Sequence, residues 1–223
     1  MKKTVQIAID GPASAGKSTV AKILAKQLGF VYCDTGAMYR SLTLAALQKE
    51  IPLEDEEALL NLLNHLEITF KQLADGQHVY LNDEDVTLAI RSIEVTKSVS
   101  EVSAFKQIRE EMVKRQKTFS LSDSIIMDGR DIGTVVLPNA DLKIFLVASV
   151  EERAERRFKE NQAKGIPADF DEIKKDIAWR DNYDSTRKNS PLVQAKDAVL
   201  LDTTGLSIND VVNKILDLAK DLI

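Results

Sequence analysis

The stretch from Ile7 to Leu24, IAIDGPASAGKSTVAKIL, decides the fold. It begins with a short run rich in β-branched residues that ends at Asp10, passes through a glycine-rich loop, and from Lys17 onward has apolar residues at helical spacing. Within it, GPASAGKS matches the pattern G-x-x-x-x-G-K-[ST]. Strand, loop and helix in this order are the context in which the pattern binds phosphate. We therefore predict a phosphate-binding loop after the first strand.

The loop also predicts how a nucleoside triphosphate would be bound. Its glycines let backbone N–H groups converge on phosphate oxygens, and the following helix adds the positive end of its dipole. Lys17 should reach the β- and γ-phosphates, and the Ser18 hydroxyl should ligate Mg²⁺. A glycine turn with an incidental lysine is the alternative. The residues assigned to nucleotide binding are Gly11, Pro12, Ala13, Ser14, Ala15, Gly16, Lys17, Ser18 and Thr19.

Beyond the loop, short apolar strands alternate with helical segments. This alternation predicts an α/β fold, a parallel sheet flanked by helices. The stretch 67–86 instead has two alternating segments around Asp75-Gly76, which predicts a small antiparallel insert. The charge-rich stretch 151–187 should form two helical pieces around Gly165-Ile166-Pro167 and is a candidate moving lid. We expect strands at 5–10, 30–34, 124–128, 142–148 and 198–201, and helices at 17–28, 36–48 and about 208–222.

Composition narrows the class of protein. The chain has 223 residues, 44% of them hydrophobic and 29% charged, and a net charge of −5. No run approaches the 18 apolar residues of a membrane span, and the negative charge disfavours a nucleic-acid partner. The single cysteine, Cys33, cannot form an intrachain disulfide, and we expect it to be a buried hydrophobe. We expect a cytoplasmic, monomeric protein that binds neither nucleic acid nor a membrane.

Two arginines in the first half of the chain are candidates for binding an anion. In CDTGAMYRS, a strand ends at Asp34, Thr35 is placed to cap the next helix, and Arg40 follows with no carboxylate at a helical neighbour position. Arg109 projects from a largely apolar helix face, where a charge is costly without a partner. A solvated Arg40 and an interhelical salt bridge at Arg109 are the structural alternatives.

A further cluster follows the third apolar strand, in IIMDGRDIGTVV. Asp128 ends the strand, and Arg130 and Asp131 follow at the carboxyl edge, where open α/β sheets bind ligands. Asp128 is a candidate partner of Mg²⁺ through a bound water, and Arg130 could bind phosphate. A plain Asp-Gly turn is the alternative interpretation.

The candidate lid carries five of the ten arginines. Arg156 has Glu152 and Glu160 four residues away, and Arg180 has Asp176 and Asp184, so pairing within a helix is a real alternative to phosphate binding. Arg153 and Arg157 instead face one another, which favours an intervening anion. The five are Arg153, Arg156, Arg157, Arg180 and Arg187.

With DGPASAGKST, DTGAMYR, DGRDIGTVV and RDNYDSTR in this order, the chain resembles the bacterial cytidylate kinases, nucleoside monophosphate kinases that act on CMP and dCMP. The resemblance runs from Thr4 to Leu222. It implies one kinase unit over 1–223 with ATP and Mg²⁺ as cofactors. Its core would comprise 1–66, 87–150 and 188–223, its monophosphate-binding insert would begin at 67–86 and extend to about 100, and its lid would be 151–187.

The resemblance also implies residue roles. Arg40, Arg130 and Arg187 would face the CMP phosphate, and Thr35 stands where the family often has a serine near that phosphate. Arg153 and Arg156 would approach the donor phosphates. The cytosine would be read by Ser100, Arg109 and Asp131, and the ribose by Arg180 and Asp184. The expected catalytic set is Lys17, Arg130, Arg187, Arg156 and Arg153.

Two other functions stay open on the sequence alone. A different small kinase with the same loop would prefer AMP or shikimate as acceptor. A nucleotide-sensing module would bind ATP and transfer nothing. A GTPase switch is disfavoured because the guanine-reading N-K-x-D run is absent: Asn213-Lys214 is followed by Ile215-Leu216.

Overall fold

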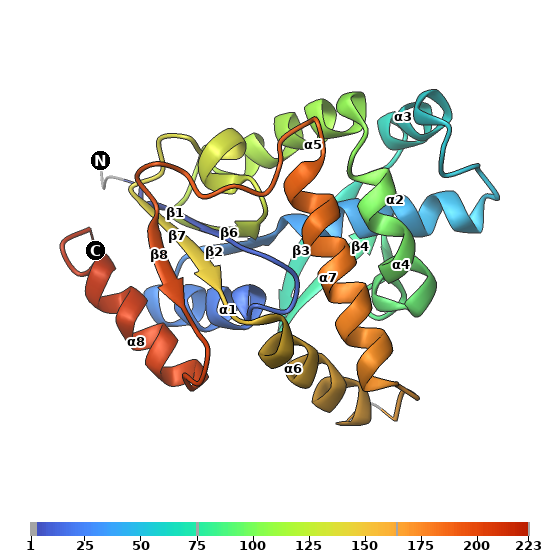
Figure 1. The fold of residues 1–223 in the computed structure, drawn as a ribbon. Coiled ribbons are helices and arrows are strands. Elements are labelled where there is room, and N and C mark those ends of the chain that lie inside the picture. Colours follow the sequence, from blue (N-terminus) through green and yellow to red (C-terminus); the bar gives the residue numbers. More distant parts are fainter. Residues whose placement is uncertain (1–3, 75, 164, 223) are drawn as a thin grey trace. The chain divides into compact units, whose positions relative to one another are not determined.

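The structure, a computed structural model, describes residues 4–74, 76–163 and 165–222 (Figure 1). The chain divides into two compact units. Asp34–Thr118 form one of them, which we call the inserted unit. The residues before Asp34 and after Thr118 form the other, which we call the sheet unit.

The sheet unit is built on five parallel strands, as the alternating pattern predicts. Their order is β2-β6-β1-β7-β8, so β1 lies at the centre and its neighbours come from distant parts of the chain. Ile9 of β1 is opposite Asp128 of β6 on one side and Ile144 of β7 on the other. The strands are β1 (Gln6–Asp10), β2 (Val31–Asp34), β6 (Ile125–Gly129), β7 (Leu142–Val147) and β8 (Val199–Asp202).

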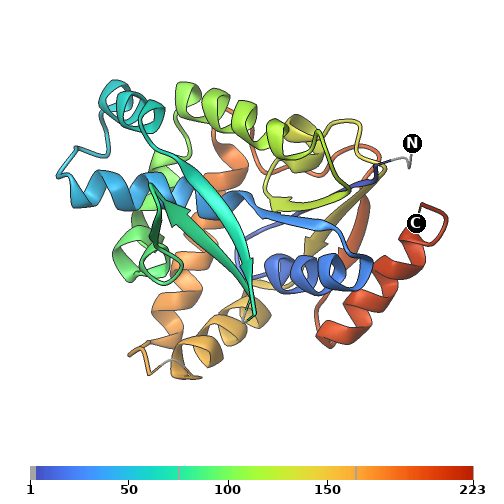
Figure 2. The ribbon, with the colours of Figure 1, turned by 180° about the vertical axis from the view of Figure 1, so that it is seen from behind.

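Two helices pack side by side on the sheet, α1 (Lys17–Leu28) and α8 (Ile208–Ala219) (Figures 1 and 2). Leu24 and Ile215 are fully buried against strand residues such as Ile7, because the apolar residues of both helices recur every three or four positions. Full burial of each such side chain stabilises the fold by about 2 kcal/mol.

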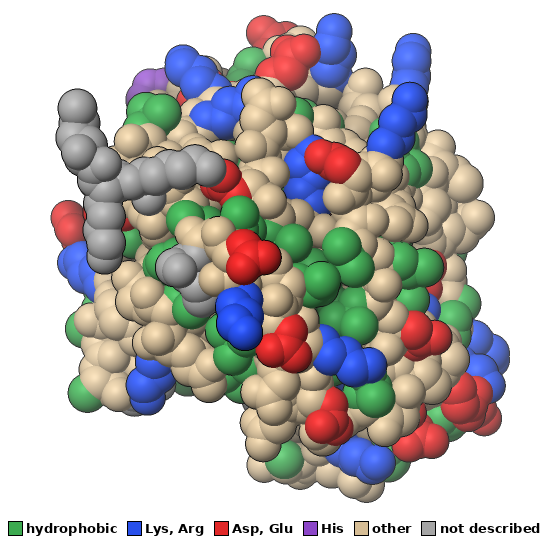
Figure 3. Space-filling model, turned by 90° about the vertical axis from the view of Figure 1, so that its left-hand side faces the viewer, with side chains coloured by type: hydrophobic (Ala, Val, Ile, Leu, Met, Phe, Trp, Pro, Cys, Tyr) green, Lys and Arg blue, Asp and Glu red, His purple; other side chains and the backbone are tan. Residues whose placement is uncertain are grey.

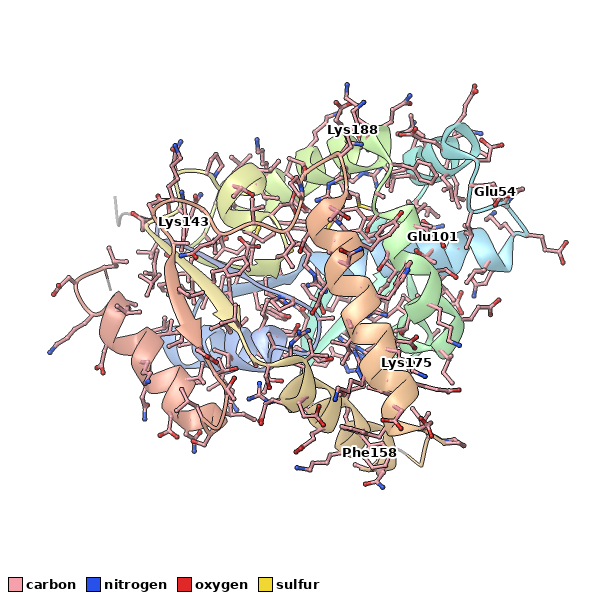
Figure 4. The ribbon with its side chains drawn as sticks, viewed as in Figure 1. Glu54, Glu101, Lys143, Phe158, Lys175 and Lys188 are labelled. Carbon is pink, nitrogen blue, oxygen red and sulfur yellow. The ribbon has the colours of Figure 1, made fainter. Side chains whose placement is uncertain are left out.

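The segment predicted as a lid is helical in two pieces, α6 (Val150–Ala163) and α7 (Phe170–Thr186). The Asp169 carboxylate caps α7 by accepting the Glu172 N–H at 2.9 Å. Phe158, labelled on α6 in Figure 4, packs edge-on against Phe170 with ring centroids 6.0 Å apart. Its role as a moving lid, and the predicted domain boundaries, stay predictions.

The inserted unit contains the predicted antiparallel element, a three-stranded sheet in the order β3-β4-β5. The strands pair from Ile68 opposite Leu81 to Leu73 opposite Gly76. Asp75, the other residue of the predicted turn, lies outside the described residues. The elements of this unit are α2 (Thr35–Gln48), α3 (Glu56–Asn64), β3 (Ile68–Leu73), β4 (Gly76–Leu81), β5 (Glu84–Asp85), the 3₁₀ turn η1 (Ala89–Arg91), α4 (Ile93–Val102) and α5 (Lys106–Phe119).

The predicted cap of α2 is wrong by one residue. Thr35 is the first helical residue, and the Asp34 carboxylate accepts the Ala37 N–H at 2.9 Å. Aspartate and threonine are both good caps, so the sequence alone could not choose between neighbours. Strand β2 therefore passes into α2 without a loop.

The surface carries both signs of charge. Acidic and basic side chains are interspersed around small hydrophobic groups on the face shown in Figure 3. Among the described residues, none of the helices combines the length and apolar character that crossing a bilayer requires.

Gly11, the residue after β1, lies in contact with the neighbouring strand. Its φ is +147°, and a Cβ at this position would lie 2.1 Å from the Leu146 carbonyl oxygen of β7. Both the backbone angle and the missing space require glycine. The first turn of the loop is thus fixed against the sheet.

We expect Gly11→Ala to lower the free energy of unfolding by more than about 3 kcal/mol, because the new methyl group meets a strand carbonyl that cannot move aside. Gly29→Ala is the matched control: its φ is +68° and nothing lies within 4 Å of the added methyl group. It should cost only about 1–2 kcal/mol from the backbone angle. Urea unfolding followed by circular dichroism measures both losses, and equal losses would contradict the steric argument.

Candidate active site

The loop between β1 and α1 is shaped to present backbone N–H groups. Ser14 (φ +60°) and Gly16 (φ +92°) both have left-handed backbone angles. Gly16 is the N-cap residue of α1 and has no side chain to accept the first N–H groups of the helix. The uncapped first turn, with the positive end of its dipole, suits a phosphate group.

Lys17 is 6% exposed, and its Nζ donates to the Pro12 carbonyl oxygen of the same loop at 2.7 Å. Burial lowers the pKa of Lys17 well below its usual value, and Arg130 lowers it further, while Asp128 and Asp10 act in the opposite direction. The ammonium group is thus poorly solvated and has a carbonyl as its hydrogen-bond acceptor. A phosphate oxygen would be a stronger partner.

Ser18 and Asp128 lie side by side, as a shared Mg²⁺ site requires. Ser18 Oγ donates to Asp128 Oδ2 at 2.7 Å, and the Tyr32 hydroxyl donates to Asp128 Oδ1 at 2.7 Å. Asp128 is buried at the end of β6. A hydroxyl and a carboxylate are oxygen ligands of the kind Mg²⁺ prefers, usually through one or two protein groups. These residues therefore fit the ion.

Asp10, which the sequence analysis did not select, anchors the segment after β6. Its two carboxylate oxygens accept the N–H groups of Ile132 and Gly133 at 2.8 and 2.7 Å. Gly133 packs closely here: a Cβ would lie 3.2 Å from Lys143 Cδ and 3.4 Å from Asp10 Oδ2, so a side chain would require these neighbours to shift. Asp10 therefore fixes the start of the π-helical turn η2 (Ile132–Val136), directly after the buried Asp131.

Three predicted arginines of the sheet unit surround one buried carboxylate, Asp184. Arg130 Nε donates to Asp184 at 2.9 Å, Arg187 lies 3.7 Å from it and Arg180 3.9 Å. Burial raises the pKa of Asp184, but the three arginines outweigh this and lower it below its usual value. Burial, with Arg130 next, lowers the pKa of Arg180 to about 10. Three guanidinium groups therefore lie around one carboxylate, an arrangement that attracts anions.

Arg153 and Arg156, expected at the donor phosphates, bind carbonyl oxygens of the loop. Arg153 Nη1 donates to Ala13 at 3.1 Å and Arg156 Nη1 to Ala15 at 3.5 Å. Arg156 also pairs with Glu152 at 3.1 Å, the pairing within a helix that their spacing allows. Both side chains therefore contact carbonyl oxygens of the phosphate loop.

In the inserted unit, Arg40 donates to Thr96 Oγ1 at 2.9 Å and to the Ile90 carbonyl oxygen at 3.4 Å. Both of these acceptors are neutral groups, on α4 and on η1. Thr35 is buried one turn before Arg40 on α2. Arg91, which the sequence analysis did not select, lies 3.3 Å from Asp34.

Ser100 and Arg109 are also buried in the inserted unit. Arg109 donates to the Ser103 carbonyl oxygen at 2.8 Å, and its guanidinium lies 5.3 Å from the centroid of the Tyr39 ring. Ser100 Oγ has no hydrogen-bond partner among the residues that the structure describes. A buried hydroxyl without a partner costs about 1–3 kcal/mol, which a bound polar group would remove.

The sequence of the chain matches one protein family over nearly its whole length. The sequence profile described as cytidylate kinase matches residues 7–221. The chain belongs to the cytidylate kinase family. It is 58% identical over 216 residues to a cytidylate kinase of Leuconostoc mesenteroides, covering 97% of this chain and 96% of that protein. It is 55% identical over 223 residues to a cytidylate kinase of Geobacillus sp., covering both chains completely.

Solved structures show that the fold extends beyond cytidylate kinases. An uncharacterized protein from Eubacterium ventriosum has a TM-score of 0.55 at 11% identity, covering 98% of this chain and 99% of that one. A gluconokinase from Sinorhizobium meliloti has a TM-score of 0.50 at 13% identity, covering 98% and 95%. At this identity the likeness concerns the fold alone.

We expect the stability that Asp10 contributes to depend on pH. Burial raises its pKa from 3.8 to about 6, against the N–H groups of Gly133 and Ile132, which lower it. The raised folded-state pKa means that this stability is present below about pH 4 and is lost as pH rises through about 6. The free energy of unfolding is measured for wild type and Asp10→Asn at about pH 4.5 and 7.5. The advantage of wild type over the variant should be larger at the lower pH, by about 2 kcal/mol. A difference independent of pH would contradict the assignment.

Proposed function

We propose that this protein transfers the γ-phosphoryl group of ATP to CMP and dCMP, forming CDP and dCDP. The observation that carries the proposal is the match of the cytidylate kinase family over residues 7–221, a range that includes the phosphate loop and every predicted site residue. High identity to curated cytidylate kinases over nearly the whole chain supports it further.

On the donor side, we assign ATP to the residues of the phosphate loop. The backbone N–H groups at the start of α1 would bind phosphate oxygens, and Lys17 would leave the Pro12 carbonyl for the β- and γ-phosphates. Ser18 and Asp128 would hold Mg²⁺ directly or through water. When bound, the ion offsets the phosphate charge.

On the acceptor side, the sheet unit would contribute the arginines around Asp184. The transferred group passes through a loose transition state whose charge is spread over its oxygens, so fixed cations accelerate transfer without a strong base. We assign Arg130 and Arg187 to the CMP phosphate, Arg180 and Asp184 to the ribose, and Asp131 to the cytosine amine.

From the inserted unit, we assign Arg40 and Thr35 to the CMP phosphate and Ser100 and Arg109 to the cytosine. The buried Ser100 hydroxyl, which has no hydrogen-bond partner among the described residues, supports its assignment to a polar ligand group. Arg109 can donate to the cytosine carbonyl oxygen, and Asp131 can accept from its exocyclic amine. Uracil has a carbonyl in place of that amine, so it would place a second acceptor opposite the carboxylate and lose this hydrogen bond.

We also propose that the protein acts in the cytoplasm as a monomer. The single cysteine supports a reducing compartment: Cys33 is 1% exposed in the sheet and cannot form a disulfide within the chain. Light scattering of the purified protein measures the oligomeric state, and the mass of a dimer would overturn the proposal that the protein is a monomer.

An acceptor panel tests the substrate assignment. With Mg-ATP as donor, we expect kcat/KM for CMP and dCMP to exceed that for UMP, AMP and shikimate by at least about 10-fold, because losing one hydrogen bond to a charged group costs about 1.5 kcal/mol or more. A coupled assay for ADP measures turnover of every acceptor. Preferred turnover of AMP or shikimate would overturn the proposal, and nucleotide binding without any transfer would favour a sensing module.

Lys17→Met should separate catalysis from stability. We expect kcat to fall by at least about 100-fold, because a cation aimed at the transferred group is lost. The melting temperature should stay the same or rise, because the substitution removes a buried charge whose pKa is lowered by burial. Lys26→Met, on the exposed side of α1, is the matched control and should keep wild-type kinetics. A parallel loss of activity and folding would assign Lys17 a structural role.

A further inference from the structure

Arg153 of α6 is 3% exposed and binds three separate parts of the sheet unit. Its Nε donates to the Ala148 carbonyl oxygen just after β7, at 2.9 Å. Its Nη1 donates to the Ala13 carbonyl oxygen of the phosphate loop, at 3.1 Å. Both terminal nitrogens bind the Asp181 carboxylate of α7, at 3.0 and 2.5 Å. The side chain therefore connects β7, the loop and α7.

The pairing with Asp181 fixes the plane of the guanidinium group. A carboxylate bound by two parallel N–H groups holds arginine in a single orientation, which a single hydrogen bond does not. Four of the five guanidinium N–H groups are then donated to protein acceptors. Asp181 is also the one charged partner among these acceptors, and a guanidinium this deeply buried would be costly without it.

The orientation of Arg153 determines how the phosphate loop presents its N–H groups. In a planar trans peptide, the carbonyl and the next N–H point in opposite directions. A bond from Arg153 to the Ala13 carbonyl therefore fixes the direction of the Ser14 N–H, away from Arg153. Arg156 makes the corresponding contact with Ala15, which precedes the Gly16 N–H. Arg153 thus orients one peptide plane of the loop, and Arg156 makes a longer contact, 3.5 Å, with a second.

We propose that Asp181 is a positioning residue for ATP: through its two-point pairing with Arg153 it holds the Ala13–Ser14 peptide in the orientation that binds the donor phosphates. Asp181 acts through Arg153 and the loop and itself touches no substrate. The proposal rests on the assignment of ATP to the phosphate loop made above. It also gives Arg153 a role in shaping the loop.

Asp181→Asn tests the proposal, because the amide keeps the size of the side chain and removes one acceptor and the charge. We expect its KM for ATP, and its dissociation constant for ADP measured by calorimetry without transfer, to rise at least about 10-fold, as for the loss of a hydrogen bond between charged groups. KM for CMP should change by less than about 2-fold. Asp181→Glu, which restores the carboxylate, should recover part of the nucleotide affinity.

A double-mutant cycle with Arg153→Lys isolates the pair. Lysine keeps the positive charge but cannot form the two-point pairing. Both substitutions remove the same interaction. The dissociation constant of the double variant for ADP should therefore be no higher than that of the single variant with the higher constant. Asp176→Asn is the matched control, an exposed aspartate on the same helix, and should keep wild-type values.

Three results would overturn the role of Asp181. The first is wild-type ADP affinity in Asp181→Asn, and the second is a loss of ADP affinity in the double variant equal to the product of the two single losses. The third is an equal rise in KM for ATP and for CMP in Asp181→Asn. If circular dichroism shows that Asp181→Asn does not fold, the same nucleotide measurements on Arg153→Lys decide the question, because that variant also removes the two-point pairing. Failure of the wild type to phosphorylate CMP would count against the proposed function, whereas ADP binding would still decide the role of Asp181.

Discussion

The close approach of Gly11 to the Leu146 carbonyl oxygen is the constraint on which the rest of the sheet unit depends. It holds the first residue after β1 against β7, and the loop then turns through the left-handed residues Ser14 and Gly16. As a result α1 begins at Lys17, with Ser18 within hydrogen-bond distance of Asp128 on the neighbouring strand. The missing methyl group at Gly11 thus lets the loop begin in contact with the sheet.

The second organising feature is local charge. The chain as a whole is acidic, with a net charge of −5, yet Asp184 is surrounded by Arg130, Arg180 and Arg187. The net charge of the chain therefore does not predict the charge of a ligand that binds in the sheet unit, because buried charges are weakly screened and act locally. Holding these cations near a carboxylate limits the cost of burying them.

The features that local pattern determines could be predicted from the sequence. The phosphate loop, the parallel strands and the antiparallel insert all follow from periodicity and glycine spacing within short stretches, and pairing of Arg156 with Glu152 follows from helical spacing. The partner of Arg153 could not be predicted, because Asp181 lies 28 residues away on another helix. Asp10 was missed for the same reason: its acceptor role depends on N–H groups 122 and 123 residues later in the chain. The assignments of single residues to ATP and CMP stay predictions.

The missing side chain of Gly133 has an evolutionary consequence. Asp10, Gly133 and Lys143 come from three separate segments, and a Cβ at position 133 would lie 3.2 Å from the Lys143 stem and 3.4 Å from the Asp10 carboxylate, so the space at 133 depends on the other two residues. Substitutions at neighbouring sites of this kind do not act independently. A larger residue at 133 would be accommodated more easily where the lysine stem or the carboxylate had been shortened. Variation across these three positions should therefore be correlated, with the order of mutational steps restricted by packing.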